Sequence, residues 1–237
     1  ESRIYRCTHC NTESLFGVCE TCGEKTKKAF YCQRCGIIFE NHCAHGGTQS
    51  YQKREIDIAA LLQKVQAQLG DKNVPDLVKG VRGTSNKDHI PEHLAKGLLR
   101  AKHDIYVNKD GTTRYDSTQL PITHFKPIEI GTPVEKLIEM GYNLDIHGNP
   151  LTDAEQVLGL LPQDVILPSC PKSPDEGADE ILFRTSRFID DLLVKLYGLS
   201  PFYCLKSKQE VVGHLINALA PHISATVVGR IIGFSQT

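Results

Sequence analysis

The chain has 237 residues, of which 40% are hydrophobic and 23% are charged. This length and composition are typical of one or two globular domains and exclude a wholly disordered chain. The net charge of −1 excludes a globally basic nucleic-acid-binding protein, so such a contact would need local basic patches. Because no apolar run approaches about 18–20 residues and the polar start is not a secretion signal, the sequence predicts a cytoplasmic protein without a membrane partner.

The cysteines are concentrated at the start of the chain, where seven of the nine lie within the first 43 residues. In a reducing cytoplasm, CxxC pairs are used for metal binding more often than for disulfides. The chain lacks an initiator Met and stops in the apolar stretch VVGRIIGFSQT, so we expect a fragment of a longer protein.

The first predicted metal site has the spacing of a zinc ribbon, with Cys7 and Cys10 followed by Cys19 and Cys22. Each CxxC turn directs two thiolates at one point, and two turns complete a closed tetrahedron without an open catalytic position. Gly23 suits the tight turn after the second pair. We therefore predict a structural Zn²⁺ site.

A second site repeats this pattern with an altered final pair. Its cysteines are Cys32, Cys35 and Cys43, and the position of a fourth cysteine is taken by Gly46. His45 is the nearest replacement ligand and His42 is the alternative, because imidazole also binds zinc. The competing interpretation is a lost metal site with buried thiols.

Basic and aromatic residues lie between and inside these two modules: Lys25, Lys27, Lys28, Phe30, Tyr31 and Arg34. They suit contacts with phosphates and bases, although solvated lysines beside small apolar cores explain them equally well.

After the cysteines, apolar residues at helical spacing predict a helix over 58–69 that ends at Gly70. Pro91 opens a second predicted helix, since proline is favourable in the first turn. Residues 104–116 contain two short β-type runs around NKDG and predict a hairpin.

The later elements follow from caps, turns and apolar periodicity. A capping-box pattern at 132–135 predicts a helix that Gly141 ends, IHGNPL predicts a turn, and QDVILP predicts a strand. Helices are predicted over 178–197 and 208–219. These signals divide the chain into tandem zinc-binding modules at 1–50, a mixed α/β segment at 51–168 and a mainly helical segment at 169–237.

No complete enzyme active site can be named, because the chain has no Gly-rich phosphate loop, HExxH, GxSxG or DxD motif. Asp190 and Asp191 are neighbours on a predicted helix, so their side chains diverge by about 100° and favour a solvated helix face. A metallohydrolase is disfavoured because its candidate residues match no ligand spacing: Asp104, His124, Asp145 and His147.

Long strings in the sequence resemble one family, the large subunit of the archaeal family D replicative DNA polymerase, also called DNA polymerase II. They lie at 78–116, 120–152, 188–199 and 211–234, and the resemblance extends over the cysteine modules. It implies an α+β fold with tandem zinc-ribbon modules followed by part of a double-psi β-barrel polymerase core with helical segments.

The resemblance also implies a role in DNA replication, as part of a DNA-directed DNA polymerase that performs template-directed nucleotidyl transfer with Mg²⁺. The family works as a heterodimer whose small subunit supplies a proofreading 3′→5′ exonuclease. The implied partners are DNA, that small subunit, the remaining C-terminal part of the large subunit and, through the complete enzyme, the sliding clamp.

The family's metal-binding aspartates lie in an NxDxDG-type motif downstream of the string that resembles VVGRIIGF, and this sequence ends before such a motif. We therefore expect no catalytic residue in this chain and no activity from it alone. A split gene, an intein and a truncation each explain such an end.

Basic residues within the resembling strings are the candidates for contacting nucleic-acid phosphates: Lys79, Arg82, Lys87, Lys96, Arg100, Lys102 and His103. The alternative is that they are solvated helix and loop residues. Four further residues lie in the resembling strings, but they are explained equally well as core histidines and a surface arginine: His124, His214, His222 and Arg230. A free-standing zinc-ribbon module that binds nucleic acid or protein without catalysis is the alternative function, and it explains only the first 46 residues.

Overall fold

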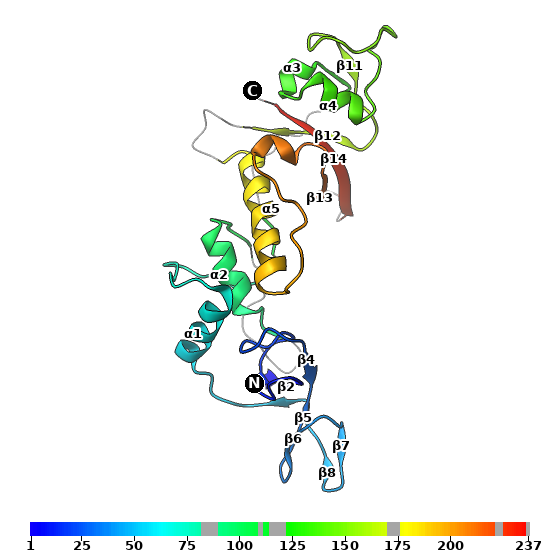
Figure 1. Cartoon of the computed structure of the whole chain (residues 1–237). Coiled ribbons are helices and arrows are strands. Elements are labelled where there is room, and N and C mark those ends of the chain that lie inside the picture. The colour runs from blue at the N-terminus through cyan, green and yellow to red at the C-terminus, as the bar shows by residue number, and fades with distance from the viewer. Residues whose placement is uncertain (82–89, 109–110, 114–121, 170–175, 221–224, 236–237) are drawn as a thin grey trace. The chain divides into compact units, whose positions relative to one another are not determined.

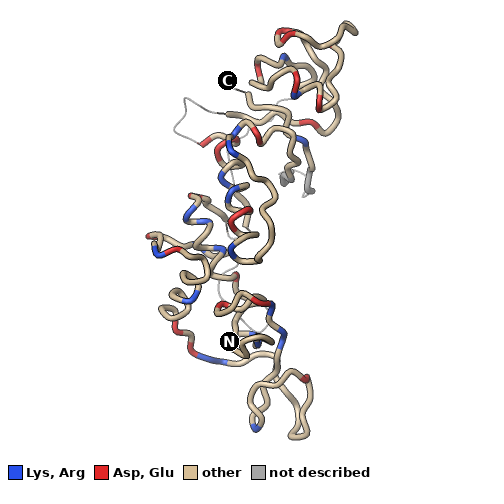
Figure 2. The backbone as a smooth tube through the Cα atoms, viewed as in Figure 1, with Lys and Arg blue, Asp and Glu red and all other residues tan. Residues whose placement is uncertain are grey.

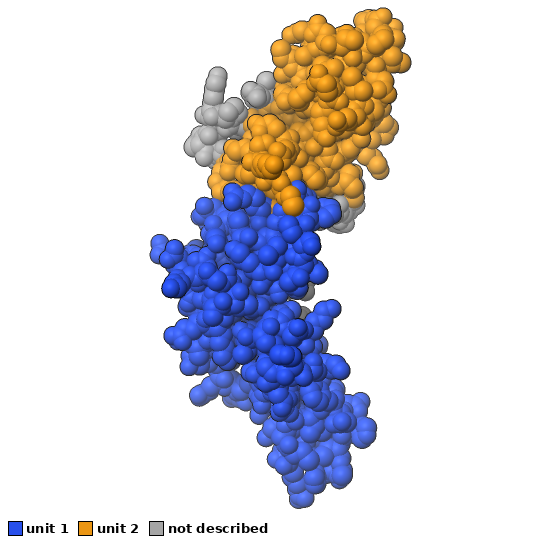
Figure 3. Space-filling model, in the orientation of Figure 1, with its two compact units in different colours: residues 1–113, 187–203 blue, residues 114–186, 204–237 orange. Residues whose placement is uncertain are grey.

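The computed structural model describes residues 1–81, 90–108, 111–113, 122–169, 176–220 and 225–235 (Figure 1). The chain forms two compact units that are not consecutive in sequence (Figure 3). Unit 1 contains residues 1–113 and 187–203, and unit 2 contains residues 114–186 and 204–237. Among the helices described, none is both long and apolar enough to cross a bilayer.

Short antiparallel strands build the N-terminal part of unit 1. Three of them form a sheet in the order β3-β2-β4, and the others pair as β1-β9, β5-β6 and β7-β8. Their bounds are β1 Ser2–Arg3, β2 Tyr5–Cys7, β3 Glu13–Ser14, β4 Thr26–Lys28, β5 Phe30–Cys32, β6 Gly36–Ile38, β7 His42–Cys43, β8 Gly46–Gly47 and β9 Tyr51–Gln52.

Helices supply the core of unit 1: α1 (Ile58–Leu69), α2 (Leu94–Lys102) and the C-terminal half of α5 (Ala178–Lys195). Their apolar faces meet in one buried cluster, with Val65 and Leu69 from α1, Leu98 and Leu99 from α2, and Leu196 after α5. Val18 from the first cysteine module packs against the same cluster, so this module is anchored to the helices.

The predicted helix at 58–69 is confirmed together with its stop signal. The Asp57 carboxylate accepts a hydrogen bond from the Ala60 amide at 2.9 Å, and Gly70 ends the helix in the left-handed region at φ +66°. The next helix begins at Leu94, so Pro91 does not lie in its first turn. Its N-cap is His93, whose Nδ1 accepts from the Ala95 amide at 3.1 Å.

Unit 2 combines short helices with a three-stranded sheet in the order β12-β14-β13. The strand β12 runs parallel to β14, and β13 runs antiparallel to it. The bounds in this unit are β10 His124–Phe125, α3 Pro127–Ile130, α4 Val134–Glu139, β11 Leu158–Gly159, β12 Asp164–Pro168, the 3-10 helix η1 Lys208–Val211, β13 Leu215–Ala220 and β14 Ala225–Ser235.

Both faces of this sheet are covered within unit 2. Ile232 of β14 belongs to a buried cluster with Phe125 and Leu137, whereas Ile231 and Phe234 pack in another cluster with Ala178. Adjacent residues of a strand point to opposite faces, so β14 joins the two clusters. The predicted strand in QDVILP and the predicted helix from 178 are confirmed as β12 and α5.

The predicted helix at 208–219 is wrong. Only the single turn η1 forms, Gly213 then adopts φ +99°, and Leu215–Ala220 pairs with β14. The left-handed glycine stops helical propagation, and the long strand β14 supplies the hydrogen-bonding partner that favours a strand. The described part of the segment 169–237 therefore combines the helices α5 and η1 with the strands β13 and β14.

The capping box predicted at 132–135 is also wrong, although the helix it announced is α4. Proline at position 133 is the N-cap, and the Thr132 hydroxyl instead donates to the Ile232 carbonyl at 2.7 Å. The predicted hairpin at 104–116 lies partly outside the described residues. In its described part, Asn108 and Thr112 close a turn through a 3.0 Å backbone hydrogen bond, without strands.

Candidate metal centres

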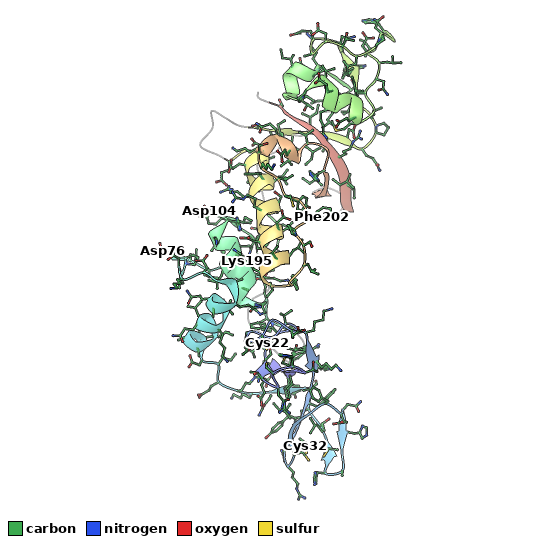
Figure 4. The ribbon with its side chains drawn as sticks, in the orientation of Figure 1. Cys22, Cys32, Asp76, Asp104, Lys195 and Phe202 are labelled. Carbon is green, nitrogen blue, oxygen red and sulfur yellow. The ribbon has the colours of Figure 1, made fainter. Side chains whose placement is uncertain are left out.

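The first cysteine group brings together Cys7, Cys10, Cys19 and Cys22, whose sulfurs all lie within 4.8 Å of one another. Cys7 ends β2, and Cys22 lies in the loop before β4 (Figure 4). The Sγ atoms of Cys7 and Cys22 are 3.4 Å apart, and those of Cys10 and Cys19 are 3.5 Å apart. Tetrahedral zinc with Zn–S bonds of about 2.3 Å would separate sulfurs by about 3.8 Å, so this group fits the ion closely.

Left-handed residues shape the turns behind these ligands. Asn11 follows Cys10 at φ +61°, Gly23 follows Cys22 at φ +76°, and Gly36 follows Cys35 at φ +75°. Asparagine and glycine tolerate this region best, which explains their use at these positions. The turn also directs an amide at sulfur, since the Thr21 N–H donates to Cys19 Sγ at 3.4 Å.

The thiols of the first group differ strongly in acidity. Hydrogen bonds from the side chain and backbone of Thr12 lower the pKa of Cys10 to about 6. The Glu24 amide lowers the pKa of Cys22, but desolvation and the neighbouring thiols outweigh it and raise that pKa to about 12. Thiolates this close repel one another, so a divalent cation is what would let all four ionise together.

The second group comes from two neighbouring hairpins. Cys32 and Cys35 belong to the β5–β6 hairpin, and Cys43 and His45 to the β7–β8 hairpin. His45 Nδ1 lies 3.1 Å from Cys35 Sγ and 3.3 Å from Cys43 Sγ. All four ligand atoms lie within 4.8 Å of one another. Cys3His is an established structural zinc set, so this group also fits the ion.

His42 lies outside the second group, and its Nδ1 is 2.8 Å from Asn41 Oδ1. The structure therefore brings His45, and not His42, together with the three cysteines. The pKa of Cys32 is lowered to about 7 by the amides of Cys35 and Arg34, whereas Cys43 and desolvation raise the pKa of Cys35 to about 11. Two residues of this group, Cys35 and His45, are exposed, whereas in the first group only Cys22 is exposed.

The predicted nucleic-acid contacts that the structure describes lie in different local surroundings. Lys79 is exposed, while the Lys96 ammonium lies 5.7 Å from the centroid of the Tyr197 ring. Lys102 pairs with Asp71 at 2.8 Å. His103 Nε2 lies 3.0 Å from a carboxylate oxygen of Asp191. Arg82 and Lys87 lie outside the described residues.

Arg100 has a structural role. It is only 7% exposed, and its guanidinium donates to both carboxylate oxygens of Glu92 at 2.6 and 2.5 Å. A third bond reaches the Lys79 carbonyl at 3.1 Å. Three of its five N–H donors are used and the side chain is buried, so in this conformation Arg100 is not available to a phosphate.

Sequence reasoning missed the partner of Arg230. Its guanidinium makes two bonds of 2.8 and 2.7 Å to Asp164, which also accepts from the Tyr142 hydroxyl at 2.6 Å. Asp164 is 8% exposed, so this group ties β12, β14 and the loop before β11 together. Nothing local could have indicated a pair 66 residues apart.

The side chains of Asp190 and Asp191 in α5 diverge as predicted. The interpretation that they form a solvated helix face is wrong, because both carboxylates are hydrogen-bonded. Asp190 accepts the Phe202 and Tyr203 amides at 2.8 and 2.9 Å, and Asp191 is bonded to His103 and Lys195. Asp145 likewise accepts amides of its own turn. Within the described part of the chain, the two cysteine groups are the sets of three or more ligands that converge.

Comparisons with known proteins agree along the whole chain. Residues 70–237 match the family described as "DNA polymerase II large subunit DP2, catalytic domain". The chain is 48% identical to the DNA polymerase II large subunit of Archaeoglobus fulgidus over 100% of its length, and 39% identical to that of Nanoarchaeum equitans over 99%. The chain is also 42% identical to the DNA polymerase II large subunit of Thermococcus kodakarensis over 100% of its length. The chain spans 20%, 22% and 13% of these relatives, respectively.

Proposed function

Because the chain belongs to the family of archaeal DNA polymerase II large subunits, we propose that it forms part of the catalytic subunit of a DNA-directed DNA polymerase. The match of residues 70–237 to the family's catalytic domain carries this proposal. Within the complete enzyme, this segment would contribute to a double-psi β-barrel core, consistent with its mixture of helices and short strands. A free-standing zinc-ribbon module is disfavoured, because the similarity continues far beyond the first 46 residues.

The two cysteine groups would each hold a structural Zn²⁺. Their closed sets of four protein ligands leave no position for a substrate, so they would stabilise fold rather than supply chemistry. The Mg²⁺ ions of nucleotidyl transfer would bind to aspartates outside these 237 residues. The residues of this chain would help to position that site. The complete enzyme would also contain the small exonuclease subunit and the rest of the large subunit.

Contacts to DNA within this segment would come from basic side chains that remain available. Lys79 is exposed, and Lys96 lies beside an aromatic ring that is itself 41% exposed. Lys102 is exposed but shared with Asp71, so it would have to exchange that carboxylate for a phosphate. We therefore expect Lys79 and Lys96 to contribute more than Lys102 or the buried Arg100.

Primer extension tests this function. The chain would be assayed with the small subunit and Mg²⁺ on a primer–template, alone and after addition of a polypeptide that carries the NxDxDG motif. We expect extension only with the added polypeptide, and none when both of its motif aspartates are replaced by asparagine. Extension by the chain with the small subunit alone, or no extension by the fully assembled mixture, would contradict the proposal.

A further inference from the structure

The stretch that spans β4 and the β5–β6 hairpin, between Glu24 and Glu40, carries a concentration of positive charge. Residues 25–39 contain Lys25, Lys27, Lys28 and Arg34 and no Asp or Glu, although the whole chain has a net charge of −1. All four side chains are exposed. Figure 2 shows blue along β4, whereas Arg34 lies apart from it in the turn of the β5–β6 hairpin. We call these four residues the basic strip.

No carboxylate forms an ion pair with the basic strip among the residues that the structure describes. Some other cations of unit 1 are paired, such as Arg54 with Glu13 at 3.4 Å and Lys195 with Asp191 at 3.1 Å. The strip therefore keeps its charge available to a ligand.

The β-sheet register brings a further cation beside the strip. Arg6 of β2 stands directly opposite Lys27 of β4, and like charges at opposed positions disfavour strand pairing. The Arg6 guanidinium donates to the carbonyls of Asn11 and Ile37, both at 3.3 Å, and on the other side of β2 Arg6 stands opposite Glu13 of β3. An anionic ligand would remove this repulsion.

Aromatic rings accompany these charges. The Lys28 ammonium, which lies on the opposite face of β4 from Lys27, is 5.3 Å from the centroid of the Phe30 ring, and Phe39, at the end of the β5–β6 hairpin, is 42% exposed. Single-stranded nucleic acids bind where cations follow the backbone and aromatic rings accept unstacked bases, whereas duplex bases are not free to stack. The combination fits a single strand better than a duplex.

We propose that the basic strip, with Arg6, Phe30 and Phe39, is a sequence-independent contact surface for single-stranded nucleic acid. This inference rests on the proposed function and adds to it a surface outside the residues 70–237 that match the catalytic domain. The structural alternative is that the lysines only offset negative zinc–thiolate groups or protect the exposed edge of β4 from other strands.

The test uses the full chain, its zinc content, and the fluorescence anisotropy of a labelled oligothymidylate of about 20 nucleotides. The triple variant K25Q/K27Q/K28Q removes three charges from the strip, and K53Q/K64Q/K72Q removes three exposed lysines elsewhere in unit 1. Each lost phosphate contact should reduce the salt slope by about 0.7, so the strip variant should lose about 2 in slope and roughly 100-fold in affinity at 0.1 M salt.

Several results would overturn the proposal: equal losses in both triple variants, equal binding of a duplex of the same length, or loss of zinc from the strip variant. F39A should weaken oligothymidylate binding about 5- to 150-fold, without changing the salt slope, if the ring stacks on a base. An unchanged affinity would exclude that stacking. The measurement needs neither Mg²⁺ nor the small subunit, so it can fail while primer extension by the assembled enzyme succeeds.

Discussion

At the scale of single residues, the two histidines of the second module give a direct test of ligand identity. We expect H45A to lower the zinc content from two ions to one per chain, because Nδ1 of His45 completes the second group. H42A should keep both ions, since its imidazole is directed at Asn41. Metal analysis of the purified chains checks this, and a halved zinc content in H42A alone would assign the ligand to the other histidine.

His93 gives a prediction about pH. Its pKa is lowered to about 4, because burial disfavours the imidazolium and Lys96 adds repulsion. A histidine in the unfolded chain titrates near 6.5, so as the pH falls the unfolded state binds the proton first. The free energy of unfolding should therefore fall between about pH 6.5 and pH 4, by roughly 2–3 kcal/mol from this residue.

The control for this effect is H93N, because asparagine can still cap α2 but does not titrate. Both proteins lose stability when their thiolates are protonated, so the informative quantity is the difference between their denaturant midpoints at pH 7 and at pH 5. We expect the wild type to lose more. Equal losses would show that His93 is not kept neutral by the fold.

Sequence spacing was enough to predict which seven cysteines converge in two groups, because each pair is local, with turns that Gly23 and Gly36 make visible, whereas the choice between His45 and His42 needed the structure. The same approach failed for Arg230 and Asp190, whose partners are distant or are backbone amides. A residue's charge is visible in the sequence, but its neutralising partner is decided by the fold.

At the scale of elements, β14 depends on an approach that only glycine permits. A Cβ on Gly233 would lie 2.7 Å from both the Ile130 Cβ and the Thr132 hydroxyl. G233A should therefore lower the free energy of unfolding by about 1–3 kcal/mol, since the core must shift to accept it. In contrast, G159A in β11 meets no atom within 4 Å and should change stability by less than about 1 kcal/mol.

Urea unfolding followed by circular dichroism measures both substitutions. An unchanged midpoint in G233A would mean that the strand relaxes away from α3 at little cost. A loss in G159A as large as that in G233A would point to a general sensitivity of unit 2 and not to this contact.

The elements that could be predicted carry their own signals. The helix α1 has an Asp cap, an apolar stripe and a terminal glycine, and α5 has a long amphipathic pattern. The residues of β13 carry an apolar spacing that also fits a helix, and their strand pairing is decided by β14. Short apolar runs are ambiguous in this way because tertiary pairing overrides local preference.

At the scale of the whole molecule, we expect the two metal groups to release zinc at different rates. The first group has two fully buried residues, Cys7 and Cys19, and one exposed residue, Cys22. The second group has one buried residue, Cys32, and two that are exposed to competing ligands, Cys35 and His45. A chromogenic chelator should therefore record a fast phase from the second group and a slow phase from the first. C43S should abolish only the fast phase, and a single phase in the wild-type chain would contradict this difference.

The family could be recognised from long strings of sequence, and the comparisons confirm it along the full length. The division of the chain into two compact units could not be predicted from the sequence. Each compact unit combines two stretches that are separated in the sequence. Unit 1, for example, contains residues 187–203 in addition to residues 1–113. The boundaries at 50 and 168, placed where the cysteine-rich pattern ends and at a polar, Pro-containing loop, remain predictions about the complete protein, since chain order alone does not reveal which stretches pack together.

One feature of unit 1 bears on how such a chain could change over evolutionary time. Tyr31 and Gln49 exchange backbone hydrogen bonds of 2.7 and 3.0 Å, so the ends of the stretch that carries the second metal group lie side by side. Beyond them, β1 and β9 continue the pairing. Residues 32–48 could thus be excised and replaced by a two-residue turn, or exchanged for an unrelated hairpin, while the surrounding frame kept its register. Evolution could therefore add or remove the stretch that carries the second metal group as one piece.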